Sequence, residues 1–138
     1  MASAGKRIWG WYFFDWASQP YSTLLLTFIF APYFAEVARA RHIAEGMAPA
    51  AAGAAAQSLW GLGLGAASVV VALLAPLLGA VADGVGRRLV WIWAFSALYV
   101  AGAAGLWALT PDGGALVWAL ACFGLGFIGM EFATIFTN

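Results

Sequence analysis

The sequence predicts an all-α protein, a polytopic bundle of about four transmembrane helices. Hydrophobic residues make up 64% of the 138 residues and charged residues only 9%, whereas roughly a quarter of an ordinary soluble domain is charged. The charged residues also separate long apolar stretches instead of alternating with them. Most of the chain is therefore expected to lie in a lipid bilayer. The bilayer is thus a predicted partner of the chain.

Four apolar stretches are long enough to cross a membrane as helices. A hydrocarbon core of about 30 Å requires roughly 20 helical residues. The second and third stretches contain no Asp, Glu, Lys or Arg, whereas the first contains Asp15 and the fourth contains Glu131. The predicted spans are residues 8–35, 59–82, 89–109 and 115–138.

The predicted connections differ in composition. Residues 36–58 begin with charged side chains and then become alanine-rich with scattered Gly and Pro, which we interpret as an irregular loop outside the cell membrane. Residues 83–88 form a short cytoplasmic loop, and the turn-forming segment Thr110 to Gly114 joins the last two spans. Short connections require neighbouring spans to be antiparallel. His42, the single histidine, is interpreted as a solvated loop residue.

The positions of lysine and arginine predict the orientation. In a four-span layout the amino-terminal side carries four of these residues and the opposite side carries two, Arg39 and Arg41. Because the excess marks the cytoplasmic side, the amino terminus is predicted to be cytoplasmic. A cleaved signal peptide is the alternative for the first stretch, but its apolar run exceeds the about 7 to 15 residues of a signal. The four residues are Lys6, Arg7, Arg87 and Arg88.

Polar side chains share one face in the first and fourth spans. At 100° per residue, the first span aligns an acid with three polar residues, and the fourth aligns Glu131 with Thr134 and Asn138. A membrane-embedded carboxylate is costly and normally faces a cavity or a partner. Two interpretations stay open: these side chains line a solute or proton pathway, or they hydrogen-bond within their own helices. The first face comprises Asp15, Ser18, Gln19 and Ser22.

Proline and glycine predict the shapes and contacts of the spans. Pro20 and Pro76 remove backbone hydrogen bonds and are expected to kink the first and second spans. Glycines in the second and third spans are interpreted as sites of close helix approach. The letters GxGxxG from Gly124 to Gly129 do not indicate nucleotide binding, because they lie inside an apolar span. The glycines of close approach are Gly61, Gly63, Gly65, Gly102 and Gly105.

Several classes of function are excluded by composition. With six basic and six acidic residues there is no basic patch, so no nucleic-acid partner is expected. Cys122 is the only cysteine and is interpreted as a small packing residue, with no metal site. Since no Ser-His-Asp or Cys-His pattern is present, we expect neither an enzyme nor a bound cofactor.

Residues Gly79 to Arg88 (GAVADGVGRR) resemble the signature between helices two and three of the major facilitator superfamily. The resemblance implies a gating motif made of Gly79, Asp83, Gly86, Arg87 and Arg88. Gly84 departs from the signature, since a basic residue often stands there. Residues 12–22 (YFFDWASQPYS) and 131–133 (EFA) look like helices one and four of the vacuolar amino-acid effluxer-like branch, which is common in bacteria.

This resemblance implies the function and location of the protein. It implies a transporter of twelve helices in the bacterial inner membrane, in which helices one and four line the cavity. We therefore expect secondary active or facilitative transport of a small-molecule solute, amino acids by resemblance, by alternating access. A proton would be the coupling ion if one of the membrane carboxylates titrates during the cycle. The chain would be an amino-terminal fragment of an incomplete major facilitator fold, lacking the remaining helices. The alternatives are a non-transporting scaffold or assembly partner, and a non-functional truncated chain.

Overall fold

Long helices make up the computed structural model, which describes residues 3–85 and 88–137, with side chains for all of these except 82, 83 and 85. Within these ranges there is no strand. Four helical stretches, Ala4–Ala44, Pro49–Val81, Arg88–Ala108 and Leu116–Thr137, are long and apolar enough to cross a membrane. The predicted class of fold, a polytopic helical membrane protein, is thereby confirmed.

Each stretch contains one or more regular elements. The first comprises α1 (Ala4–Pro20), the π-helix η1 (Tyr21–Phe28) and α2 (Phe30–Ala44). The second is the single helix α3 (Pro49–Val85). The others are α4 (Arg88–Gly105) with the short 3₁₀-helix η2 (Leu106–Ala108), and α5 (Leu116–Thr137).

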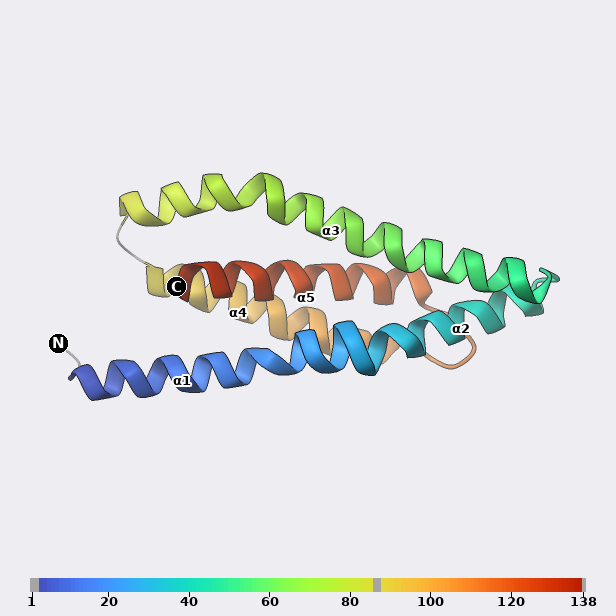
Figure 1. Cartoon of the computed structure of the whole chain (residues 1–138), viewed down its shortest axis with the longest axis horizontal. Helices are drawn as coiled ribbons and strands as arrows, with labels where there is room; N and C mark the ends of the chain where they lie inside the picture. Colours follow the sequence, from blue (N-terminus) through green and yellow to red (C-terminus); the bar gives the residue numbers. More distant parts are fainter. Residues whose placement is uncertain (1–2, 86–87, 138) are drawn as a thin grey trace.

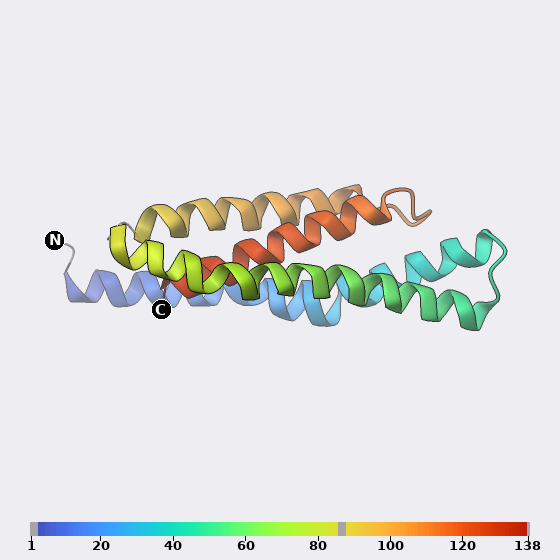
Figure 2. The ribbon, with the colours of Figure 1, turned by 90° about the horizontal axis from the view of Figure 1, so that it is seen from above.

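The helices run alternately in opposite directions, as their short connections predicted. Figures 1 and 2 show α1, η1 and α2 as one long rod, along which α3 returns, with α4 and α5 following as an antiparallel pair. The start of α1 and the end of α5 lie at the same end of the bundle (Figure 1). In that view α5 lies between α1 and α3, and three of its side chains, Ala119, Phe123 and Phe132, are at 0% exposure.

Glycine brings α4 and α5 into backbone contact. A Cβ added at Gly102 would collide with the backbone nitrogen of Gly126 and lie 2.6 Å from the carbonyl oxygen of Cys122. A Cβ added at Gly129 would lie 2.6 Å from the backbone nitrogen of Tyr99. In lipid, where apolar surfaces gain little by meeting each other, such small residues allow the van der Waals contact that holds helices together.

The other glycines predicted to allow close approach divide into two groups. Gly63 lies against the side chain of Leu120, and Gly105 lies against the sulfur of Cys122. Gly61 and Gly65 have no atom within 4 Å of an added Cβ, so the prediction is wrong for these two. Both are exposed, on a different face of α3 from Gly63, and spacing along one helix cannot identify which face is packed.

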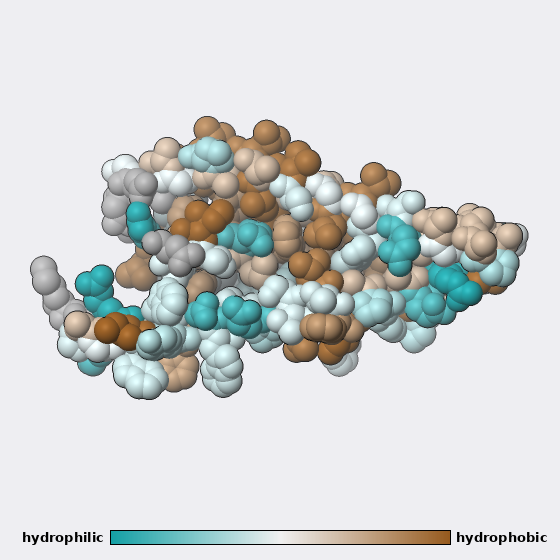
Figure 3. Space-filling view, in the orientation of Figure 1, coloured by the Kyte–Doolittle hydropathy of each residue, from teal (hydrophilic) through white to brown (hydrophobic). Residues whose placement is uncertain are grey.

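Two aromatic clusters fill the interior. In the first, Phe123 packs against Trp60, Phe30 and Tyr21 with ring centroids 4.6, 5.8 and 5.5 Å apart. In the second, Phe95 of α4 packs against Phe132 of α5 at 4.9 Å. Outside these clusters, many large apolar side chains are exposed, and Figure 3 shows hydrophobic patches on this face of the bundle, as expected where the solvent is lipid.

The predicted irregular connection at residues 36–58 is wrong in extent. α2 continues to Ala44 and α3 begins at Pro49, which leaves residues 45–48 between the helices. Alanine is the strongest helix former and proline is favoured at the first helical position. Ala52 and Ala56 are fully buried, so this segment packs as a helical hairpin instead of forming a loop.

This hairpin extends beyond the rest of the bundle. α3 has 37 residues and is therefore roughly 55 Å long, well above the about 30 Å of a hydrocarbon core. Both views show the α2–α3 turn projecting past the connection between α4 and α5 (Figures 1 and 2). At this end of the bundle the α2–α3 hairpin therefore extends farther than the α4–α5 connection.

The predicted loop at residues 83–88 is also largely helical. α3 continues through Val85 and α4 starts at Arg88, so Gly79, Asp83 and Gly84 are helical residues. Gly86 and Arg87 lie outside the described residues. Neither Asp nor Gly stops a helix by itself. Each has a low helix propensity, but the free energy that the span gains by packing is larger than this cost.

Candidate functional site

The polar face predicted on the first span lies on α1 and the start of η1. Asp15 and Gln19 are exposed, whereas Ser18 and Ser22 are half-buried. The Ser18 hydroxyl donates to the Asp15 backbone carbonyl at 2.8 Å, and the Ser22 hydroxyl donates to the Gln19 carbonyl at 3.1 Å. The two serine protons are thus used within the helix, while Asp15 has no ion pair among the described residues. Figure 3 shows hydrophilic surface over α1 as well as over the two ends of the bundle.

The kink predicted at Pro20 takes the form of a π-helix. Proline has no N–H, so the regular helical ladder is interrupted there, and Tyr21–Phe28 continues with the wider π geometry. The backbone N–H of Ile29 donates to the Leu24 carbonyl at 2.7 Å, five residues back. The Thr27 hydroxyl also reaches the Ser22 carbonyl at 2.8 Å. A widened segment in a membrane span is therefore directly adjacent to the polar face of α1.

Tyr21 attaches this π-helix to α5. Its side chain is 1% exposed, and its hydroxyl donates to the Phe123 carbonyl at 2.5 Å. The ring also stacks on Phe123 and meets Tyr99 edge-on at 5.2 Å. An added Cβ at Gly126 would collide with the Tyr21 hydroxyl, so the absence of a side chain there makes room for this contact. No local pattern in the sequence distinguishes Tyr21 as a site residue.

Pro76 lies within α3, which stays helical from end to end. Figure 1 shows a change of direction in the second half of this helix, the half that contains Pro76. Other backbone groups of the span remain hydrogen-bonded, which is why a transmembrane helix tolerates one proline.

The polar face predicted on the fourth span lies on α5. Glu131 is half-buried. The Thr134 hydroxyl donates to the Met130 carbonyl at 2.9 Å, so this proton is used within the helix. Asn138 lies outside the described residues. Neither Asp15 nor Glu131 lines the hollow beside Lys6 and Arg7 or the hollow beside His42.

A polar cluster at the opposite end of the bundle connects α2 to the loop before α5. Arg41 donates to the Gly113 carbonyl at 2.5 Å and to a Glu45 carboxylate oxygen at 2.9 Å. Nδ1 of His42 lies 3.5 Å from the other Glu45 oxygen. His42 is therefore a half-buried residue of α2, and the prediction that it is a solvated loop residue is wrong. The cluster lies beside a hollow of about 500 Å³ that Trp118 also lines.

The turn in this cluster depends on one glycine conformation. Gly113 has φ +71°, which disfavours residues with a side chain, and its backbone N–H donates to the Thr110 carbonyl at 3.0 Å. The predicted turn at Thr110 to Gly114 is thus confirmed. The spacing of Arg41 and Glu45 could have indicated their pairing, but no local pattern indicates that Arg41 also binds a carbonyl 72 residues away.

The pKa of Glu45 should report whether this cluster forms. The hydrogen bond from Arg41, followed by that from His42, lowers the pKa of Glu45 below its ordinary value. A lowered pKa means that the pairing stabilises the fold at neutral pH and is lost as pH falls through that pKa. We expect a carboxyl NMR titration to show the pKa of Glu45 rising in Arg41→Gln and staying unchanged in Arg39→Gln. An unchanged pKa in Arg41→Gln would contradict the pairing.

Metal and thiol chemistry have no evident location in the described part of the chain. No group of three His, Cys, Asp or Glu side chains could hold a metal ion there. Cys122 is buried, and its sulfur lies against Gly105, in agreement with the predicted packing role.

The four spans define the chain as a helical, membrane-embedded protein. Comparisons with protein-family models, with curated proteins and with solved structures found no match.

Proposed function

We propose that the chain contributes its four spans to a secondary transporter of the major facilitator type, similar to the vacuolar amino-acid effluxer-like branch. The transporter would move a small solute, amino acids by resemblance, through alternating access. The amino terminus would lie in the cytoplasm of a bacterial cell. The start of the first span and the α3–α4 connection, which lie on the same side, together carry four of the six lysines and arginines.

One observation carries this proposal: an exposed carboxylate lies next to an interrupted span. Asp15 is exposed and is the one acidic residue of α1, and five residues later Pro20 leads into the π-helix. π-Helical segments are frequent at functional sites, and interrupted transmembrane helices form the solute sites of many secondary transporters. A lipid-facing carboxylate would be costly, so Asp15 is expected to face an aqueous cavity in the working transporter.

In the proposed transporter, separate residues bind the solute, accept the coupling proton and form the gate. Asp15 and Gln19 contact the polar groups of the solute, and Glu131 in α5 accepts the coupling proton. Asp83, Arg87 and Arg88 form the cytoplasmic gate that the resemblance implies. An acid and two cations at the ends of adjacent helices can pair in one state and separate in the other.

An assembly partner without transport activity is the second candidate function. α1 has no buried residue, and Trp9 and Trp16 are 64% and 72% exposed. Such a helix could pack against another membrane protein, with Asp15 paired across that interface.

Replacing Asp15 tests the proposed transport. In proteoliposomes containing the product of the complete reading frame, we expect Asp15→Asn to reduce uptake of labelled amino acids about tenfold or more. A hydrogen bond to a charged group contributes roughly 1.5–3 kcal/mol, which corresponds to this loss. The matched control is Asp112→Asn, which alters an exposed loop carboxylate and should leave uptake unchanged.

Either of two results would contradict the proposal. Equal uptake by Asp15→Asn and the parent protein would remove Asp15 from the mechanism. No solute movement by the folded protein, together with a stoichiometric complex with another membrane protein, would instead favour the assembly partner.

A further inference from the structure

A basic hollow lies at one end of the bundle, and neither Asp15 nor Glu131 lines it. It has a volume of about 870 Å³ and lies between the first turns of α1, the start of α4 and the last turn of α5. Its lining includes two adjacent cations, Lys6 and Arg7, and aromatic side chains from two helices. Within the described residues no carboxylate lines it. The hollow is therefore positively charged and open to an anionic ligand.

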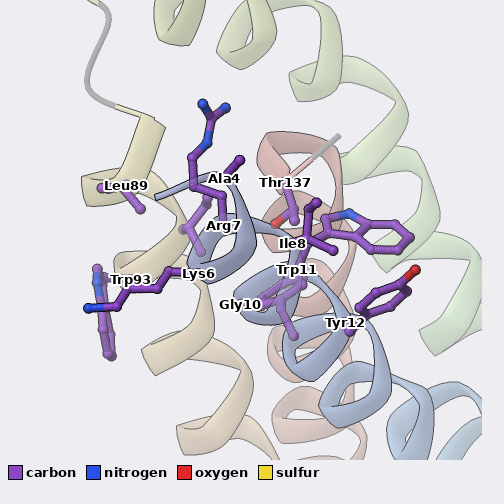
Figure 4. A pocket seen from close by; sticks show the side chains of 12 residues that line it. Ala4, Lys6, Arg7, Ile8, Gly10, Trp11, Tyr12, Leu89, Trp93 and Thr137 are labelled. Atoms are coloured by element: carbon purple, nitrogen blue, oxygen red, sulfur yellow. The ribbon is translucent and has the colours of Figure 1, made fainter. Parts of the chain in front are cut away.

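The side chains of the hollow are arranged around its mouth. Figure 4 shows Lys6 extending from α1 toward Trp93 of α4, while Arg7 extends past Ala4 in a different direction, away from Trp93. Neither cation has an ion pair among the described residues. Two charges from one helix turn thus reach different sides of the opening.

The walls below these charges are apolar and accessible. Leu89, Trp93 and Ile8 are 71%, 75% and 54% exposed. Trp11 and Tyr12 add indole and phenol rings to the lining, and such rings favour the boundary between lipid and water. A ligand that fits this arrangement has an anionic head at the mouth and hydrocarbon chains along the walls.

We propose that this hollow binds the headgroup of an anionic phospholipid. Arginine can bind a phosphate through two parallel hydrogen bonds, and lysine adds a point charge. Basic pockets between membrane helices bind acidic headgroups in the same way. The acyl chains would lie against Leu89 and Trp93, where α4 is exposed. The proposal rests on the position of the helices in the membrane and does not depend on solute transport.

Lipid titration monitored by native mass spectrometry tests the proposal. The full chain in nonionic detergent would be titrated with dihexanoyl phosphatidylglycerol, dihexanoyl phosphatidylcholine and inorganic phosphate. We expect one phosphatidylglycerol to bind more tightly than phosphatidylcholine. Lys6→Gln and Arg7→Gln should each weaken this binding about fivefold, the effect of about 1 kcal/mol per basic residue near a membrane surface.

The matched control is Arg39→Gln, which removes a cation that pairs with Glu36 near the other end of the bundle. This variant should bind phosphatidylglycerol like the parent chain, and the circular dichroism of all three variants should match the parent. Equal binding of the two lipids, or unchanged binding in both Lys6→Gln and Arg7→Gln, would overturn the proposal. Inorganic phosphate that binds as tightly as phosphatidylglycerol would identify a free anion and also overturn it.

Discussion

Gly102→Val is expected to separate α4 from α5 and to cost about 3 kcal/mol or more of stability, at or above the upper end of the usual range for overpacking. An added side chain at this position meets the backbone of α5, at the nitrogen of Gly126 and the carbonyl oxygen of Cys122. Backbone atoms cannot move aside as a flexible side chain can. The α4–α5 contact must therefore open, and the contacts between Gly129 and Tyr99 would open with it.

The only cysteine provides the measurement. Cys122 is 5% exposed and lies against Gly105, between the two helices. We expect a maleimide to label Cys122 slowly in the parent chain and many times faster in Gly102→Val. Gly65→Val is the matched control, because an added Cβ at Gly65 meets no atom within 4 Å. Equal labelling rates in the two variants would show that the packing of α4 against α5 does not depend on contact between their backbones.

The second large effect is expected from Tyr21→Ala. Removing a fully buried aromatic side chain typically costs about 3–5 kcal/mol. Tyr21 contacts Phe123 and Tyr99 and donates to the Phe123 carbonyl. Without it, the π-helix loses its attachment to α5. We expect denaturation in mixed detergent micelles to occur at a lower SDS fraction.

Two further variants separate the contributions of Tyr21. Tyr21→Phe keeps the ring and removes the hydrogen bond, and should cost only about 0.6 to 1.7 kcal/mol, as for other interhelical hydrogen bonds in membranes. Tyr12→Ala is the matched control, because Tyr12 is 55% exposed on α1. If Tyr12→Ala destabilised the bundle as much as Tyr21→Ala, the attachment by Tyr21 would be refuted.

Hydropathy and length were sufficient to predict the four spans, because a membrane helix satisfies its own backbone and needs only apolar side chains. Helix ends were less predictable. Residues 36–44 and 49–58 carry charges, Gly and Pro, yet they are helical because Phe34, Ala38 and Ala56 become buried between α2 and α3. Burial against a second helix cannot be read from one segment alone.

The candidate site was predictable only in part. Asp15 and Pro20 stood out because a charge and a proline are unusual in apolar spans. The attachment of Tyr21 to α5 depends on the absence of a side chain at Gly126, which lies 105 residues farther along the chain. Tyr21 has no local feature that distinguishes it from the exposed Tyr12.

The sequence by itself determined the membrane location, the spans and their antiparallel order, since these follow from local hydropathy and from short connections. Only the tertiary structure decided which faces of the helices meet. Tyr21 and Phe123 are 102 residues apart, and Arg41 and Gly113 are 72 apart. Glycine contacts between α4 and α5 likewise depend on the rotation of each helix. In a chain that is apolar on all sides, hydropathy does not identify the packed face, so packing and a few hydrogen bonds select it.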